Sequence, residues 1–241
     1  MSIDGNAVAV AAGGQHALAL TADGALWTWG GNQFGQVGDG TTMPRPAPML
    51  IGRGFAKIAA GGSHSLAINR EGTLFAWGNN ESGQLGIGAR EAVVPTEVGR
   101  DFLEVAAGRN HTLAIKRGGS LWAWGDNQIG QLGNRSSASQ PTPLKIGEDS
   151  DWTSVATGSG HSLAIRAKSS LFAWGANEEG QLGTGTGVSV NVPTKVEGDF
   201  VQIAAGAYHS VAVKPDGSVW VWGASDQGQA GKGASPKPRS M

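Results

Sequence analysis

Bulky and small side chains alternate along this chain in a pattern that predicts β-strands. Residues 64–68 read His-Ser-Leu-Ala-Ile, so His64, Leu66 and Ile68 share one face of a strand, and Ser65 and Ala67 share the other. A sheet with one bulky and one small face suits a position between similar sheets, because the large side chains of one sheet fill the space beside the small ones of the next. The pattern therefore indicates strands that are covered on both faces.

The pattern is repeated five times with a fixed internal spacing. The histidines of the chain are His16, His64, His111, His161 and His209, at intervals of 47 to 50 residues. Each is followed thirteen residues later by the tryptophan of a Trp-Gly pair, at Trp29, Trp77, Trp124, Trp174 and Trp222. A Gly-Gln pair follows at Gln36, Gln84, Gln131, Gln181 and Gln229, and every change of length falls after this glutamine. A constant packed part with variable connectors indicates a repeated supersecondary unit.

Each unit is expected to contain four short strands. The first begins at an aromatic residue such as Phe55, the second begins at the histidine, and the third carries an aromatic-x-Trp pair. A segment marked by proline, as in residues 95–98, is expected to be an edge strand, because proline cannot donate a hydrogen bond into a ladder. Antiparallel strands repeated every 40 to 50 residues or so predict an all-β fold, a β-propeller with one four-stranded blade per repeat. The units span approximately residues 6–52, 53–99, 100–147, 148–198 and 199–233, and residues 234–241 form a C-terminal tail or a closing strand.

The recurring motifs A-G-x-x-H-S-L-A, G-x-L-(W/F)-x-W-G and N-x-x-G-Q-L-G resemble the regulator of chromosome condensation repeat over nearly the whole chain. Members of that family are usually seven-bladed propellers, closed by pairing of strands from both chain ends. This chain departs from the pattern in having five units, which we interpret as five blades, with a truncated array as the alternative. The ring would close if residues 236–241 added a strand beside residues 8–12. The last unit also departs from the motif, with Ser225 in place of the turn asparagine and Ala230 in place of leucine.

Composition and charge narrow the classes of partner. The chain has 241 residues, a net charge of −1 and no cysteine, and its pI is about 6.5. A net charge this close to zero produces no positive electrostatic field that would attract nucleic acid or an anionic membrane. The first residues lack a basic start before their apolar stretch, and no apolar run approaches ~18 residues. We expect a cytoplasmic protein that binds neither nucleic acid nor membrane.

The five histidines raise the possibility of a metal site. Each occupies the same place in its own unit, so rotation about a propeller axis keeps equivalent rings apart, and we expect each imidazole to bond the backbone of a neighbouring turn. No Ser-His-Asp grouping or phosphate-binding G-x-x-x-x-G-K-[ST] motif stands out from the repeats. The sequence therefore predicts no metal, no cofactor and no catalytic residue, and the protein is not expected to be an enzyme.

Residues that do not repeat are the candidates for recognition. Strand alternation places the A-G-x-x-H turns and the loops after tryptophan at one end of the propeller, and the Asp-Gly hairpins at the other. The first end, which we call the loop face, is expected to carry non-repeating apolar and arginine side chains, the composition of a contact surface. The candidate partner-binding residues are Phe34, Arg45, Arg109, Ile129, Arg135 and Tyr208. Ordinary variation of loops is an equally open interpretation.

These observations favour a non-catalytic scaffold that binds another protein through the loop face. The family resemblance implies a second function, guanine-nucleotide exchange on a Ran-like small GTPase, which the founding family member performs. A third class is inhibition of an extracellular enzyme by a propeller of this type, against which the missing export signal counts. Fold alone decides among none of these, and the partner is not identified by the sequence.

Overall fold

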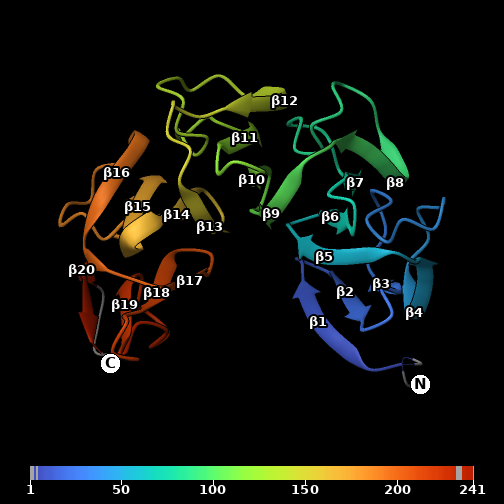
Figure 1. Ribbon diagram of the computed structural model, residues 1–241, viewed down its shortest axis with the longest axis horizontal. Helices are drawn as coiled ribbons and strands as arrows, with labels where there is room; N and C mark the ends of the chain where they lie inside the picture. The colour runs from blue at the N-terminus through green and yellow to red at the C-terminus, as the bar shows by residue number, and fades with distance from the viewer. Residues whose placement is uncertain (1–2, 4, 232–234, 241) are drawn as a thin grey trace.

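A computed structural model describes residues 3, 5–231 and 235–240. It contains five four-stranded antiparallel sheets, each built from four strands that are consecutive in the sequence. Figure 1 shows the sheets as blades that follow one another around a common centre. The predicted all-β architecture of five four-stranded blades is confirmed.

The strands occupy equivalent positions in successive blades (Figure 1). The first strands, which lie nearest the centre, are β1 (Ala7–Ala12), β5 (Phe55–Ala60), β9 (Phe102–Ala107), β13 (Trp152–Thr157) and β17 (Gln202–Ala205). The second strands are β2 (His16–Thr21), β6 (His64–Asn69), β10 (His111–Lys116), β14 (His161–Arg166) and β18 (His209–Val213). The third strands are β3 (Leu26–Gly30), β7 (Leu74–Gly78), β11 (Leu121–Gly125), β15 (Ser170–Gly175) and β19 (Val219–Gly223). The outer strands are β4 (Arg45–Gly52), β8 (Ala92–Gly99), β12 (Gln140–Lys145), β16 (Val190–Asp199) and β20 (Ser235–Ser240).

Every outer strand contains proline, as expected for a strand that pairs on one side only. Each histidine is the first residue of a second strand and lies opposite the glycine that ends the third strand, as His16 lies opposite Gly30. The histidines thus occupy equivalent places in successive sheets. This register brings the A-G-x-x-H turn and the loop after tryptophan to the same end of each blade.

The C-terminal segment differs from both expectations for it. Residues 235–240 are neither a tail nor a strand beside residues 8–12, because they form β20, which pairs with β19 and completes the fifth blade. Trp220 lies opposite Ser240, and Gly223 lies opposite Ser235. This pairing gives the last blade the same four strands as the others. Residues 234 and 241, which the expectation also covered, lie outside the described residues.

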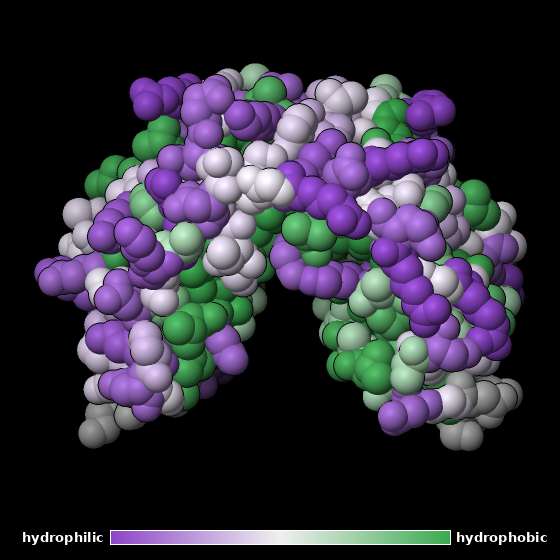
Figure 2. All heavy atoms as spheres, viewed as in Figure 1, coloured by the Kyte–Doolittle hydropathy of each residue, from purple (hydrophilic) through white to green (hydrophobic). Residues whose placement is uncertain are grey.

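The ring is open in this structure. Figure 2 shows a wedge-shaped opening between the blade that contains the N-terminus and the blade that contains the C-terminus. Val8 and Val10 of β1, the innermost strand of the first blade, are 58% and 78% exposed. The residues equivalent to Val10 in the following blades are only partly exposed, because each is covered by a preceding sheet.

Consecutive blades are joined by a repeated polar contact, which we call the clasp. The backbone carbonyl of the repeat glutamine accepts two hydrogen bonds from the next blade, one from a tryptophan indole and one from a hydroxyl. At the second interface Trp124 Nε1 donates to Gln84 O over 2.9 Å, and the Thr112 hydroxyl donates to the same oxygen over 2.8 Å. The same pair of bonds occurs at the other three interfaces, with distances of 2.7 to 2.9 Å.

The first tryptophan of this series lacks a clasp. Trp77, Trp124, Trp174 and Trp222 are fully buried, whereas Trp29 is only half-buried. Within the part of the chain that the structure describes, no glutamine carbonyl accepts a hydrogen bond from the Trp29 indole.

Matched substitutions at two tryptophans test the clasp. Trp124→Phe should lower the free energy of unfolding by about 2 kcal/mol or more, because it removes a buried hydrogen bond and leaves a gap in the packing. Trp29→Phe should cost less than about 1 kcal/mol, because that side chain is only partly packed. Urea unfolding of both variants measures the difference. Equal losses would show that the clasp contributes nothing beyond the burial of a ring.

The hairpin of the fourth blade has lost the glycine found in the other copies. Its turn is a short 3-10 segment, Ala167–Ser169. Ser169 has φ of 62° at the position that Gly24, Gly72 and Gly217 occupy with φ of 84° to 87°. Its carbonyl nevertheless accepts the hydrogen bond from Phe200 N of the next blade, as the other hairpins do for theirs. The contact between blades at this end therefore survives a backbone conformation that disfavours serine.

Candidate functional site

Four of the five histidines, His16, His64, His111 and His161, lie between consecutive blades. In the first four blades Nε2 of the ring lies 2.9 to 3.3 Å from the clasp hydroxyl of the next blade, as His161 Nε2 does from Ser210 Oγ. That hydroxyl already donates its proton to a glutamine carbonyl, so it accepts from the ring, and Nε2 carries the proton. The hydrogen-bond partner of the imidazole is thus a side chain of the next blade. The sequence predicts the backbone of a neighbouring turn instead, and this prediction is wrong.

Burial shifts the titration of these rings. Removal from water lowers the pKa of His16 and His111 to about 4 and that of His64 and His161 to about 3. Repulsion from neighbouring histidines lowers the pKa of His64 and His161 further. Nδ1 of each of these four rings is buried and has no hydrogen-bond partner among the described residues. The rings are therefore neutral packing elements at physiological pH.

The glycine of the A-G-x-x-H turn is explained by close approach. A Cβ added to Gly158 would lie 2.2 Å from His161 Cε1 and 2.5 Å from the carbonyl oxygen of Gly206 in the next blade. The equivalent glycines of the other blades meet their own histidine rings at 2.1 to 2.3 Å. The glycine of the motif is therefore required by the close packing of the histidine ring and the neighbouring blade, which is a structural role.

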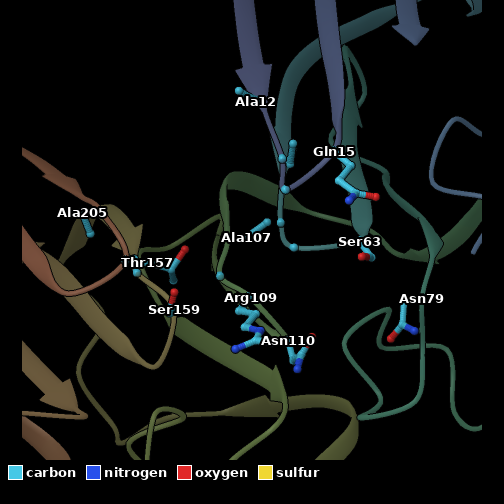
Figure 3. A pocket seen from close by; sticks show the side chains of 18 of the residues that line it. Ala12, Gln15, Ser63, Asn79, Ala107, Arg109, Asn110, Thr157, Ser159 and Ala205 are labelled. Carbon is cyan, nitrogen blue, oxygen red and sulfur yellow. The ribbon is translucent and has the colours of Figure 1, made fainter. Parts of the chain in front are cut away.

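The A-G-x-x-H turns of all five blades surround a central cavity of about 780 Å³. Its wall is formed mainly by small residues and backbone, with Phe34, Asn79 and Glu81 contributed by loops after tryptophan. Figure 3 shows Arg109 and Asn110 projecting from one turn, near Ser159 of the next. The cavity thus offers backbone groups and the guanidinium of Arg109 for contact.

A second cavity of about 480 Å³ lies beside the first and is shared by the loops of the third, fourth and fifth blades. We call it the side pocket. Ile129 and Tyr208 line it and are 46% and 53% exposed. Arg109 lines both cavities, so the two form one continuous feature of the loop face.

The structure brings four of the six candidate residues to these two cavities. Phe34 and Arg109 line the central cavity, and Arg109, Ile129 and Tyr208 line the side pocket. Arg45 lies apart from both, where it forms an ion pair with Asp39 of its own loop. Arg135 is exposed and lines a different cavity, between outer parts of the third and fourth blades. Four candidates therefore form a group, and two do not join it.

Three carboxylates of the side pocket were not among the candidates. Asp126, Glu178 and Glu179 line it together with Ile129 and Tyr208. A comparison of the repeats could have found Asp126, because the equivalent residues of the other copies are Gly31, Asn79, Ala176 and Ala224. Glu178 and Glu179 carried a weaker signal, since adjacent acids in a turn commonly face water.

No cluster of three or more metal-ligating side chains occurs among the described residues. The part of the chain that the structure describes also contains no helix long and apolar enough to cross a membrane. The geometry of the loop face is thus one of exposed rings, an arginine and carboxylates around two cavities. Such groups can make contacts with a polypeptide.

Comparison with known proteins gives matches along the entire chain. The model of a family described as RCC1-like domain matches residues 1–241. The solved structure of human WBSCR16 is 24% identical with a TM-score of 0.89, and the alignment covers 100% of this chain and 68% of that one. Yeast RCC1 (Prp20), solved bound to Kap60, is 22% identical with a TM-score of 0.78, over 98% of this chain and 74% of that one. At these identities the likeness shows the fold alone.

A local match also occurs among curated proteins. A segment of 44 residues is 46% identical to the E3 ubiquitin-protein ligase HERC2 of Homo sapiens and of Mus musculus. It represents 18% of this chain and 1% of either relative. The match therefore covers about one repeat of a far longer protein.

Proposed function

Because this chain belongs to the RCC1-like domain family over residues 1–241, we propose that it is a non-catalytic protein-binding module whose partner docks on the loop face. The observation that supports the proposal best is the grouping of Arg109, Ile129 and Tyr208 around one pocket. Exposed aromatic, aliphatic and arginine side chains are typical of protein contact surfaces.

The loops after tryptophan are held in place by hydrogen bonds from a buried asparagine to their own backbone. Asn127 Oδ1 accepts a hydrogen bond from Leu132 N over 3.0 Å, and Asn127 Nδ2 donates to the carbonyls of Ser136 and Ala138. Asn32 and Asn177 hold their own loops in the same way. Ordered loops lose little conformational entropy on binding, which favours a preformed docking surface.

Substitution of the grouped residues tests the docking face. A variant with Phe34→Ala, Arg109→Ala and Tyr208→Ala should lose its partners in pull-down from cell extract, with affinity reduced at least ten-fold or so, because it removes two rings and a cation from the surface. A matched variant with Arg53→Ala and Arg117→Ala, both exposed near the opposite hairpins, should keep them. Retention of partners by the first variant and loss by the second would move the site to the hairpin face.

Guanine-nucleotide exchange is the second candidate. One of the solved relatives is described by its binding of Gsp1p and histones, namely Prp20p of Saccharomyces cerevisiae, which is 23% identical with a TM-score of 0.72. It aligns over 98% of this chain and 76% of that one. Exchange requires that the module lower the nucleotide affinity of a bound GTPase, so release of fluorescent GDP from small GTPases distinguishes exchange from simple docking. An enzyme inhibitor of this fold would instead bind without any effect in that assay.

A further inference from the structure

The side pocket collects residues that the repeat does not require. Asp126 is the only acid at its repeat position. Tyr208 is the only tyrosine of the chain, at a position where the other copies have Gln15, Ser63, Asn110 and Gly160. Scaffold residues must recur in every blade, as the clasp residues do across the four interfaces. The convergence of Asp126, Ile129 and Tyr208 on one cavity therefore has no explanation in the packing of the blades.

The charges of this pocket are unbalanced. Asp126, Glu178 and Glu179 line it, against a single cation, Arg109. None of these four groups forms an ion pair within the described residues, whereas acids such as Asp39 and Asp149 are paired with arginines elsewhere. Glu178 and Glu179 are exposed. The pocket thus presents unneutralised negative charge next to apolar surface, which is complementary to a cation on an apolar stem.

A buried glutamine holds the pocket in shape. Gln131 is 2% exposed, its Nε2 donates to Asp126 Oδ2 over 2.9 Å, and its Oε1 accepts from Ile129 N over 3.0 Å. In the second blade Gln84 Nε2 donates to Asn79 Oδ1, so the same arrangement exists there with an amide in place of the carboxylate. Asp126 Oδ1 also accepts from Gln128 N and from the Ser139 hydroxyl. Because Asn79 accepts from Glu81 N and Gln84 Nε2 at the same place in the second blade, the loop does not require the negative charge of Asp126.

We propose that the side pocket binds a lysine or arginine side chain of the partner protein. The aliphatic stem packs on Ile129 and the Tyr208 ring, and the charged head bonds the carboxylates of Asp126 and Glu178. Arg109 projects at the central cavity in Figure 3 and remains available for other contacts there. The inference rests on the proposed docking function and adds the chemistry of the partner.

Tyr208 provides a direct reporter of this pocket, because selective isotope labelling of tyrosine yields the signal of one residue. The probe is the peptide acetyl-Gly-Ala-Lys-Ala-Gly-amide, added to the full chain while the Tyr208 ring resonances are followed by NMR. A saturable shift is expected, with affinity about five-fold or more above that of the peptide with norleucine in place of lysine. The lysine peptide should also bind more weakly at high salt.

Two variants complete the test. The double variant Asp126→Asn and Glu178→Gln should lower the affinity for the lysine peptide about five-fold or more and leave the affinity for the norleucine peptide unchanged. Glu71→Gln, at an exposed hairpin of the opposite end, should alter neither. An unmoved Tyr208 signal, or equal binding of lysine and norleucine peptides, overturns the proposal. This titration needs no partner protein, so it can fail independently of the docking proposal. If the lysine peptide does not bind but the variant of Phe34, Arg109 and Tyr208 loses its partners, the pocket does not take a lysine or arginine side chain and the docking function still holds.

Discussion

Acidification from about pH 7 to pH 5 should reduce the free energy of unfolding by on the order of 5 kcal/mol or more. Burial lowers the pKa of His16 and His111 to about 4 and of His64 and His161 to about 3, while an unfolded histidine titrates near pH ~6.5. Between these values the unfolded chain binds more protons than the folded one. Stability is therefore complete above the unfolded pKa and falls as the pH drops from there toward the folded values.

Urea unfolding at about pH 7, 6 and 5 measures this loss. The slope of the unfolding free energy against pH gives the number of protons taken up on unfolding, about four at the acid end of the range. His111→Gln should reduce that number to about three, whatever it does to stability at neutral pH. The hydroxyl of Ser218 lowers the pKa of Asp216 below its ordinary value of 3.8. Carboxylates of this kind stay ionised between about pH 7 and pH 5, so they do not change the unfolding free energy in this range. A stability that stays constant between neutral pH and the acid end would contradict the burial of four neutral rings.

Gly158→Ala is expected to cost about 3 kcal/mol or more of stability, or to prevent folding, because the new methyl group overlaps two groups that have no room to move. One is the His161 ring, held by its bond to Ser210, and the other is the Gly206 carbonyl of the next blade. The clash with the Gly206 carbonyl is relieved only if the fourth and fifth blades move apart, and the clash with the His161 ring only if that ring leaves its place beside Ser210. Chemical unfolding, with far-UV circular dichroism as the signal, measures the loss.

Gly160 of the same turn is the matched control. A Cβ there would lie 3.5 Å from the Ala176 Cβ and 3.6 Å from Ile129 Cδ1, which are ordinary contacts. Neither Gly158 nor Gly160 has positive φ, so alanine causes no backbone strain at either position. Gly160→Ala should therefore change stability by less than about 1 kcal/mol. Comparable losses in both variants would indicate a general need for glycine in the turn, not a specific clash.

Much of the candidate site was predictable from the repeats, and part of it was not. Phe34, Arg109, Ile129 and Tyr208 stand out because they break a pattern, and the structure places them at two adjoining cavities. Arg45 breaks the pattern as well, yet it pairs with Asp39 of its own loop. Composition at a loop position does not reveal whether a side chain is already neutralised by a neighbour. Asp126 also breaks the pattern, as the only acid at its repeat position, but its significance depends on the pocket that it lines.

The sequence by itself determined the blade. Alternation of bulky and small residues, the positions of proline and the fixed spacing from histidine to tryptophan depend on contacts within a few residues or one hairpin, so a linear pattern records them. Only the tertiary structure decided that each histidine of the first four blades bonds a hydroxyl of the next blade, that residues 235–240 complete the fifth sheet, and that the ring is open. These features arise between residues about fifty positions apart or at the two ends of the array. The physical reason is that contacts between blades depend on how whole sheets stack, and one repeat does not specify that stacking.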